Sequence, residues 1–118
     1  MSKIKVKTTL ITPSTKLTYE ALGELKDNII TYHEQDELTT LVTYDLTKDS
    51  LTRDNKQLTL NYLFKENIVT PGKLNIKDMQ KDLELITKTN HLLKKDHYLE
   101  VEFLVENKKY TYILEWEA

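Results

Sequence analysis

The sequence predicts an all-β protein folded as a mostly antiparallel β-barrel, and three observations carry this prediction. Apolar and polar residues alternate along most of the chain, most plainly from Leu99 to Trp116. Because successive side chains of a strand point to opposite faces, this period of two gives each strand one wet and one dry face. Short segments rich in Asn, Asp and Lys separate the alternating runs, as hairpin turns do. Sixteen threonines and seven tyrosines, with only two glycines, suit pleated strands rather than helices.

Each alternating run between two turn segments is expected to be one strand. The ten predicted strands are residues 3–12, 16–26, 29–35, 38–46, 50–54, 57–65, 73–77, 82–93, 97–106 and 109–117. A helix competes with a strand only from Asn75 to Ile86, where apolar residues also recur at spacings of three and four. We expect a strand over 82–90 and keep a helical turn over 76–81 as the alternative.

So many strands are expected to close on themselves, because an open sheet leaves unpaired edges that promote aggregation. A two-sheet sandwich is the other solution, but it usually needs long crossover connections. Only one segment, around Val69 to Gln80, is long enough for such a crossover connection. We therefore predict a single domain, residues 1–118, folded as a mostly up-and-down barrel of eight to ten strands.

Charge and composition exclude several classes of function. The net charge is −2 at pH 7, and Arg53 is the only arginine among 17 basic residues. A protein that binds nucleic acid by electrostatics needs a basic surface, so no nucleic-acid partner is expected. No stretch is apolar enough for a membrane helix or a secretory signal, and no membrane partner is expected. The absence of cysteine agrees with a reducing compartment, and we expect the protein in the cytoplasm.

Several short motifs resemble one known family. They are IITYHE at 29–34, TLV at 40–42, LTRD at 51–54 and LELITKT at 83–89. Together they resemble the YwiB-like family of small bacterial proteins, in which an L-S-Y-x-E strand is followed by a T-x-(I/V) strand and a hairpin entered at an arginine. An L-x-L-x-T-x-T strand and two long terminal strands come later in that family. The similarity extends from Ile4 to Trp116.

This resemblance implies a calycin-like barrel, the architecture shared by lipocalins and fatty-acid-binding proteins, in a family without an established biochemical function. The chain departs from the family pattern twice. Asp54-Asn55 replaces the hairpin glycine after the arginine, a mild change because Asn tolerates positive φ. Near Lys81-Asp82 a second glycine is replaced, which affects the register expected for residues 76–82.

Arg53 is the strongest candidate for a binding residue, because its guanidinium can hold a carboxylate through two hydrogen bonds and a lysine cannot. Glu34 is its expected partner across the sheet, and Tyr32 lies on the same strand face as Glu34. With Thr40 and Tyr62, these residues form the predicted ligand-binding set. The predicted apolar wall is Val42, Leu60, Tyr62, Phe103 and Tyr112. The alternative interpretation is a structural ion pair that fixes register at the mouth of a hairpin.

These residues predict a non-enzymatic protein that binds a small amphipathic or anionic ligand inside the barrel, with no metal or other cofactor. The alternative is a barrel filled by its own side chains, which binds a protein partner or forms a homodimer. Strands that are apolar on both sides, as at Leu41-Val42 and Leu63-Phe64, suggest that part of the outer face is covered. A third class, a metal-assisted or acid-base enzyme, would use His33 or His97.

Other motifs carry less information. The three histidines, His33, His91 and His97, match no zinc-binding spacing. Five glutamates alternate with apolar residues on the later strands and fit a solvated outer face better than a glycosidase pair. They are Glu84, Glu100, Glu102, Glu115 and Glu117.

Two side-chain groups have a simple structural explanation. Lys3, Lys5 and Lys7 share one face of the first strand, and we interpret them as a guard against edge-to-edge pairing rather than a phosphate-binding stripe. The aromatic residues are interpreted as core or barrel lining, because base-stacking barrels pair such rings with a basic groove. They include Tyr32, Tyr44, Tyr62, Tyr98, Tyr110, Tyr112 and Trp116.

Overall fold

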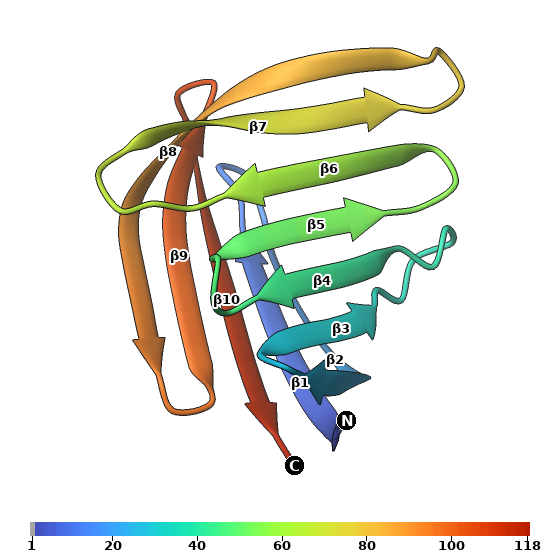
Figure 1. Cartoon of the computed structure of the whole chain (residues 1–118), viewed down its shortest axis with the longest axis vertical. Coiled ribbons are helices and arrows are strands. Elements are labelled where there is room, and N and C mark those ends of the chain that lie inside the picture. Colours follow the sequence, from blue (N-terminus) through green and yellow to red (C-terminus); the bar gives the residue numbers. More distant parts are fainter. Residues whose placement is uncertain (1) are drawn as a thin grey trace.

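Ten antiparallel strands form one closed barrel in the computed structural model, which describes residues 2–118 (Figure 1). The strands are β1 (Ser2–Ile11), β2 (Lys16–Lys26), β3 (Ile29–His33), β4 (Leu41–Asp45), β5 (Ser50–Asp54), β6 (Leu58–Leu63), β7 (Val69–Ile76), β8 (Lys81–Lys95), β9 (Tyr98–Val105) and β10 (Lys108–Glu117). All residues that belong to a regular element within 2–118 are in strands, which confirms the all-β prediction. No helix in this part of the chain is long and apolar enough to cross a membrane.

The barrel is an up-and-down meander in which each strand pairs with its neighbours in sequence, and β1 closes the ring by pairing with β10. That last pairing runs from Lys5 opposite Glu117 to Ile11 opposite Thr111. Because β1 pairs with β2 on its other side, it has no free edge. The interpretation of the lysines as an edge guard is therefore wrong for Lys5 and Lys7, which are paired on both sides, and these exposed side chains cover the outer face.

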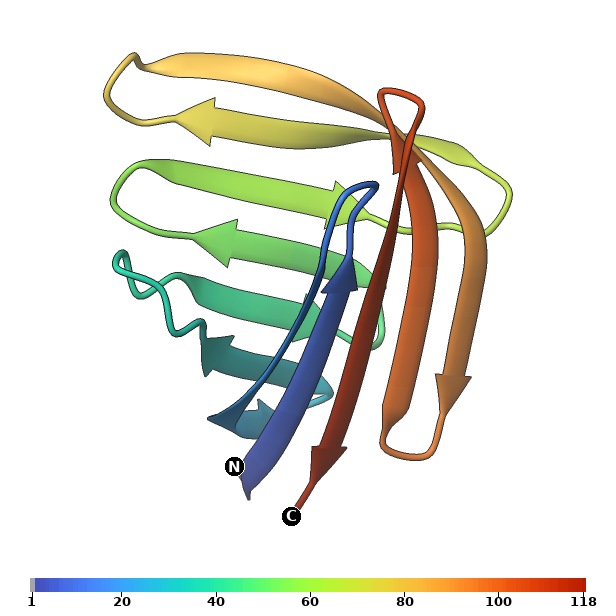
Figure 2. The same cartoon turned by 180° about the vertical axis from the view of Figure 1, so that it is seen from behind.

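The sheet turns sharply at two places, so that β3 to β7 cross the direction of β8, β9, β10 and β1 (Figures 1 and 2). One corner is in β8, where a register shift between Thr89 and His91 marks a bulge. The other is in β2 at Gly23, where a Cβ atom would lie 2.6 Å from the carbonyl oxygen of Thr31. Glycine allows this close approach of two backbones, as at other tight corners of barrels.

The seventh strand differs from the prediction. It begins at Val69 rather than residue 73, because Pro71 and Gly72 lie within the strand and not in a connection. A proline has no N–H to donate, yet it fits where the ladder does not need that donor. The helical alternative for residues 76–81 is wrong, since Lys77 to Gln80 form the β7–β8 turn. Gln80 turns the chain there with a φ of 47°.

Most turns are of the hairpin type that the sequence indicates. Asp27-Asn28 and Glu106-Asn107 both have two consecutive positive φ values, as a two-residue hairpin of type I′ requires. Asn55, however, works through its side chain, whose oxygen accepts hydrogen bonds from the backbone N–H groups of Gln57 and Leu58 at 2.8 and 3.0 Å. The β5–β6 turn therefore forms without a glycine because an Asx turn replaces it.

The interior of the barrel is packed at one end only. At the end that contains the termini and the β2–β3, β4–β5 and β8–β9 turns, large buried side chains form the core. They include Ile30, Tyr44, Phe64, Leu99 and Leu114, each at most 1% exposed. Tyr44 stacks on Phe64 with ring centroids 6.5 Å apart. Toward the β1–β2, β3–β4 and β5–β6 turns the packing gives way to a cavity.

Candidate functional site

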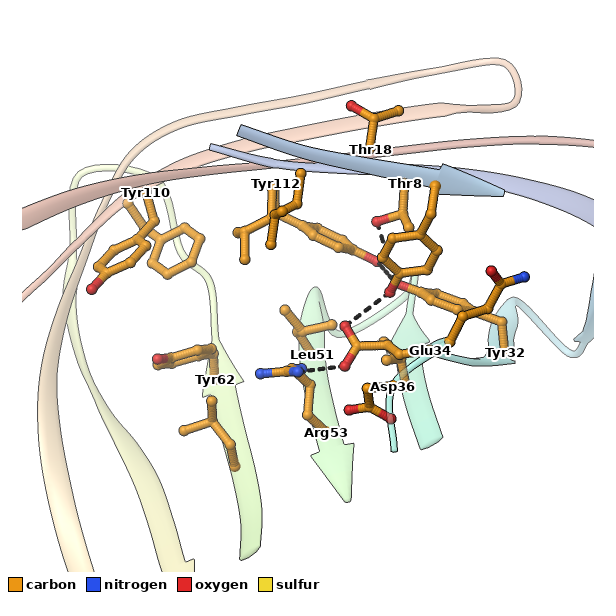
Figure 3. Close-up of a pocket in the computed structure, with 17 residues that line it drawn as sticks. Thr8, Thr18, Tyr32, Glu34, Asp36, Leu51, Arg53, Tyr62, Tyr110 and Tyr112 are labelled. Atoms are coloured by element: carbon orange, nitrogen blue, oxygen red, sulfur yellow. Dashed lines mark hydrogen bonds and ion pairs between the residues drawn. The ribbon is translucent and has the colours of Figure 1, made fainter. Parts of the chain in front are cut away.

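A cavity of about 520 Å³ lies between the packed core and the turns at the open end (Figure 3). Its lining is mostly apolar and aromatic, and the charged side chains of Glu34, Asp36 and Arg53 lie together. The lining residues are Thr8, Leu10, Leu17, Thr18, Tyr19, Tyr32, Glu34, Gln35, Asp36, Val42, Leu51, Arg53, Leu60, Tyr62, Phe103, Tyr110 and Tyr112. The volume falls within the range of about 300–1,000 Å³ of small-molecule sites.

Strand register places the central residues of the site in one row across the inner face. Tyr32 lies opposite Val42, Val42 opposite Arg53, and Arg53 opposite Leu60. Directly opposed residues of antiparallel strands point to the same face, so all four side chains enter the barrel. The sequence therefore predicts their common orientation, and the register adds that they are neighbours.

Glu34 joins two polar side chains at the side of the cavity. Its Oε1 forms an ion pair with Nη2 of Arg53, and its Oε2 accepts a hydrogen bond of 2.9 Å from the Tyr19 hydroxyl (Figure 3). Burial lowers the pKa of Arg53, but the hydrogen bond and charge of Glu34 outweigh it and the net shift is upward. The Nε of Arg53 is buried without a hydrogen-bond partner in residues 2–118. Arg53 is thus held in place by one of its nitrogens.

Two tyrosine hydroxyls form the deep polar part of the cavity. The Tyr32 and Tyr112 oxygens are 2.7 Å apart, and the Tyr32 hydroxyl donates a longer hydrogen bond, of 3.4 Å, to Thr8 Oγ1. Burial raises the pKa of both tyrosines, most strongly that of Tyr112. The hydroxyls therefore stay neutral at physiological pH and act as hydrogen-bonding groups rather than charges.

The β3–β4 loop supplies an acidic group to the mouth of the cavity. Both oxygens of Asp36 accept hydrogen bonds from Thr40, from its hydroxyl at 2.7 Å and its backbone N–H at 2.9 Å. These bonds lower the pKa of Asp36, which therefore stays ionised at neutral pH. Thr40 is fully buried under the loop and does not line the cavity. It positions Asp36 and also accepts a hydrogen bond from Asn55 at 3.0 Å.

The structure brings together most of the residues expected in the site. Arg53, Glu34, Tyr32 and Tyr62 line the cavity, as do all members of the expected apolar wall, Val42, Leu60, Tyr62, Phe103 and Tyr112. Sequence reasoning missed Tyr19, Thr8 and Asp36. Tyr19 could have been found, because it alternates with Ala21 and Gly23 on the inner face of β2. Asp36 could not have been found in this way, because it lies in the loop between β3 and β4, where side chains do not alternate with a period of two.

The structure does not bring the histidines together. His33 is exposed at the end of β3, His91 lies 3.4 Å from Glu100, and His97 lies 3.6 Å from Asp96. Across residues 2–118, no group of three or more metal-ligating side chains is positioned to hold an ion.

Comparison with known proteins gives one structural match. No family model matches the chain, and no curated protein does. The crystal structure of the YwiB protein from Bacillus subtilis superposes with a TM-score of 0.63 and 16% sequence identity, over 98% of this chain and 89% of that one. The chain therefore has the fold of YwiB, and its resemblance to the YwiB-like family is confirmed at the level of the fold.

Proposed function

We propose that this protein is a non-enzymatic binding protein, which takes a small amphipathic molecule into the open half of its barrel. The observation that carries the proposal is the 520 Å³ cavity, whose lining is mostly apolar and aromatic and whose charged side chains lie together (Figure 3). A ligand with an apolar body and a single polar head fits that division. We assign this role to the cytoplasm, the compartment expected for a chain without cysteine.

The packing of the barrel supports a binding role over a purely structural one. Side chains fill the end of the barrel near the termini, so a protein of this size does not need to be hollow in order to close. Keeping the other end open sacrifices buried apolar contact there, and small-molecule sites commonly have this form. The apolar body of the ligand would lie against Leu60, Phe103 and Tyr112, and its head near Arg53, Glu34 and Tyr32.

Two leucines of β2 provide a matched test. Leu17 lines the mouth of the cavity and is 56% exposed, whereas Leu22 lies on the outer surface and is 79% exposed. Leu17→Trp should obstruct the mouth and weaken the binding of Nile red, a neutral apolar dye, by about tenfold or more, because the indole occupies the entrance. Leu22→Trp adds the same bulk outside and should leave binding unchanged. Equal effects of both substitutions would contradict the proposal.

Native mass spectrometry of the gently purified chain gives a second, independent test. We expect a small molecule that stays bound to the native protein and is released on unfolding. Arg53→Ala should lower the occupancy of that molecule. If Arg53→Ala lowers stability but leaves every ligand response unchanged, Arg53 belongs to a structural ion pair only.

Self-association is a second candidate, and a specific surface favours it. Three apolar side chains of this region are largely exposed, namely Ile68 at 52%, Val69 at 58% and Ile86 at 64%, and the register puts Val69 and Ile86 on the same face of β7 and β8. Exposed apolar patches of this kind commonly mark protein interfaces. Light scattering should then give twice the chain mass of 13.9 kDa. The variant Ile86→Lys should have the mass of a single chain. A single chain mass for the unmodified protein would exclude this candidate.

A further inference from the structure

The charges around the cavity are unequal, and this bears on the head group of the ligand. Three formally charged side chains line the cavity, the carboxylates of Glu34 and Asp36 and the guanidinium of Arg53. Arg53 is paired with Glu34. Asp36 takes part in no ion pair within residues 2–118 and is held instead by two neutral donors of Thr40. The cavity therefore has an excess of one negative charge at its mouth.

The hydrogen-bonding groups show a similar asymmetry. Glu34 accepts one hydrogen bond on each oxygen, and so does Asp36. A carboxylate can accept about four hydrogen bonds in total, so Glu34 and Asp36 can each accept about two more. Among the donors, the Tyr19 hydroxyl is directed to Glu34, and Tyr32 is engaged with Thr8 and Tyr112. Arg53 donates one Nη2–H to Glu34, and its buried Nε–H has no partner within residues 2–118. The free capacity on this side of the cavity therefore comprises acceptor positions on two carboxylates and the remaining N–H groups of one guanidinium.

An anionic head group would find this side unfavourable. At the remaining N–H groups of Arg53 it would lie beside Glu34, whose carboxylate already neutralises the guanidinium. It would pass Asp36 on the way and be repelled by both carboxylates. A cation meets the opposite conditions, since it is attracted by the carboxylates. Aromatic rings also line the cavity and offer their faces to a positive charge.

We propose that the ligand is an amphipathic amine, whose protonated head lies between the carboxylates of Glu34 and Asp36 and whose apolar body enters the barrel. This inference rests on the proposed binding function and specifies the ligand class of the same site. It replaces the anionic alternative that the lone arginine suggests, because in the fold that arginine is already neutralised by Glu34.

Three unbranched probes of ten carbon atoms test the inference, namely decylamine, decanol and decanoate, each used to displace Nile red. Decylamine should act at a concentration about fivefold to tenfold lower than decanoate, since a pair of charges near a protein surface retains a part of its Coulomb energy. Decanol should fall between the two. Raising the salt concentration should reduce the difference.

Matched variants assign the effect to the cavity. Asp36→Asn should remove most of the preference for the amine, and Glu34→Gln should do the same independently if the loop variant proves unstable. The control is Asp96→Asn, which makes the same change of charge at a carboxylate that is 97% exposed in the β8–β9 turn. Its preference should equal that of the unmodified protein.

The outcomes separate the two proposals. If decanoate or decanol displaces the dye better than decylamine, the binding function stands and the amine inference is overturned. If Asp36→Asn and Glu34→Gln both behave like Asp96→Asn, the inference is also overturned. If the unmodified chain binds neither the dye nor any probe, the binding function itself fails.

Discussion

The hydroxyl oxygens of Tyr32 and Tyr112 lie 2.7 Å apart, although 80 positions separate the two residues in the chain. Tyr32 is on β3 and Tyr112 on β10, and their contact links two strands that β1 and β2 separate in the barrel. The pair also sets the depth of the cavity, because the core is closely packed beyond it.

The two hydroxyls should contribute unequally to stability. Tyr32→Phe leaves the buried Tyr112 hydroxyl without its partner and should cost about 1–3 kcal/mol. Tyr112→Phe should cost less, because the Tyr32 hydroxyl keeps Thr8 as an acceptor. The double variant should lose less than the sum of the single losses. Urea unfolding of the four proteins measures this, and strictly additive losses would show that the hydroxyls do not interact.

The Arg53–Glu34 pair should contribute modestly to folding. Its side chains are 36% and 17% exposed, so solvent weakens the attraction. We expect a coupling energy of about 1 kcal/mol in a cycle of Arg53→Gln and Glu34→Gln. A coupling above about 3 kcal/mol is the value typical of a fully buried pair and would favour a structural role.

The two glycines should respond differently to alanine. At Gly23 the new Cβ would meet the Thr31 carbonyl oxygen at 2.6 Å, and backbone cannot move aside, so Gly23→Ala should cost about 2–3 kcal/mol. At Gly72 the nearest atom is Tyr62 Cδ1 at 3.0 Å, in a side chain that lines the cavity and can shift. Gly72→Ala should cost about 1 kcal/mol or less and alter dye binding. The reverse order of melting temperatures would contradict this account.

Alkaline pH should unfold the protein. A hydrogen bond to Glu100 and burial raise the pKa of Tyr98 to about 12, and burial raises the pKa of Tyr19, Tyr32, Tyr44, Tyr62 and Tyr112. Above the ordinary tyrosine pKa of 10.0, the unfolded chain loses protons that the folded chain keeps, so the free energy of unfolding falls as pH rises. Urea titrations from about pH 8 to pH 12 should show constant stability up to about pH 9 and a decrease beyond. Constant stability over the whole range would show that these tyrosines titrate alike in both states.

Glu66 should stabilise the bulge of β8. Its Oε2 accepts a hydrogen bond of 2.9 Å from the Leu92 N–H, next to the register shift. Glu66→Ala should accelerate hydrogen exchange at the Leu92 amide and cost about 0.5–1.5 kcal/mol. Lys65→Ala, at the preceding residue, is the control and should leave that amide unchanged. Similar exchange rates in both variants would show that water replaces the Glu66 carboxylate without loss.

Sequence alone determined the ten strands and most of the turns between them, because strand alternation and hairpin chemistry are local properties of neighbouring residues. It failed locally at Pro71-Gly72, where residues typical of a turn lie inside β7. It also indicated that Tyr32, Arg53 and Leu60 face the same side, since that follows from the period of two. The sequence thus predicted which side chains face the interior, but not which of them meet in the site.

Only the tertiary structure decided which end of the barrel is packed and which is hollow. That depends on how side chains from distant strands, such as Tyr44 and Tyr112, fill a common volume, and no local pattern records it. The fold likewise placed Thr40 beneath the β3–β4 loop and Asp36 at the cavity mouth, because loop positions follow hydrogen bonds rather than a period. The charge of the site is therefore a property of the closed barrel, in which Glu34 meets Arg53 and Asp36 remains unpaired among residues 2–118.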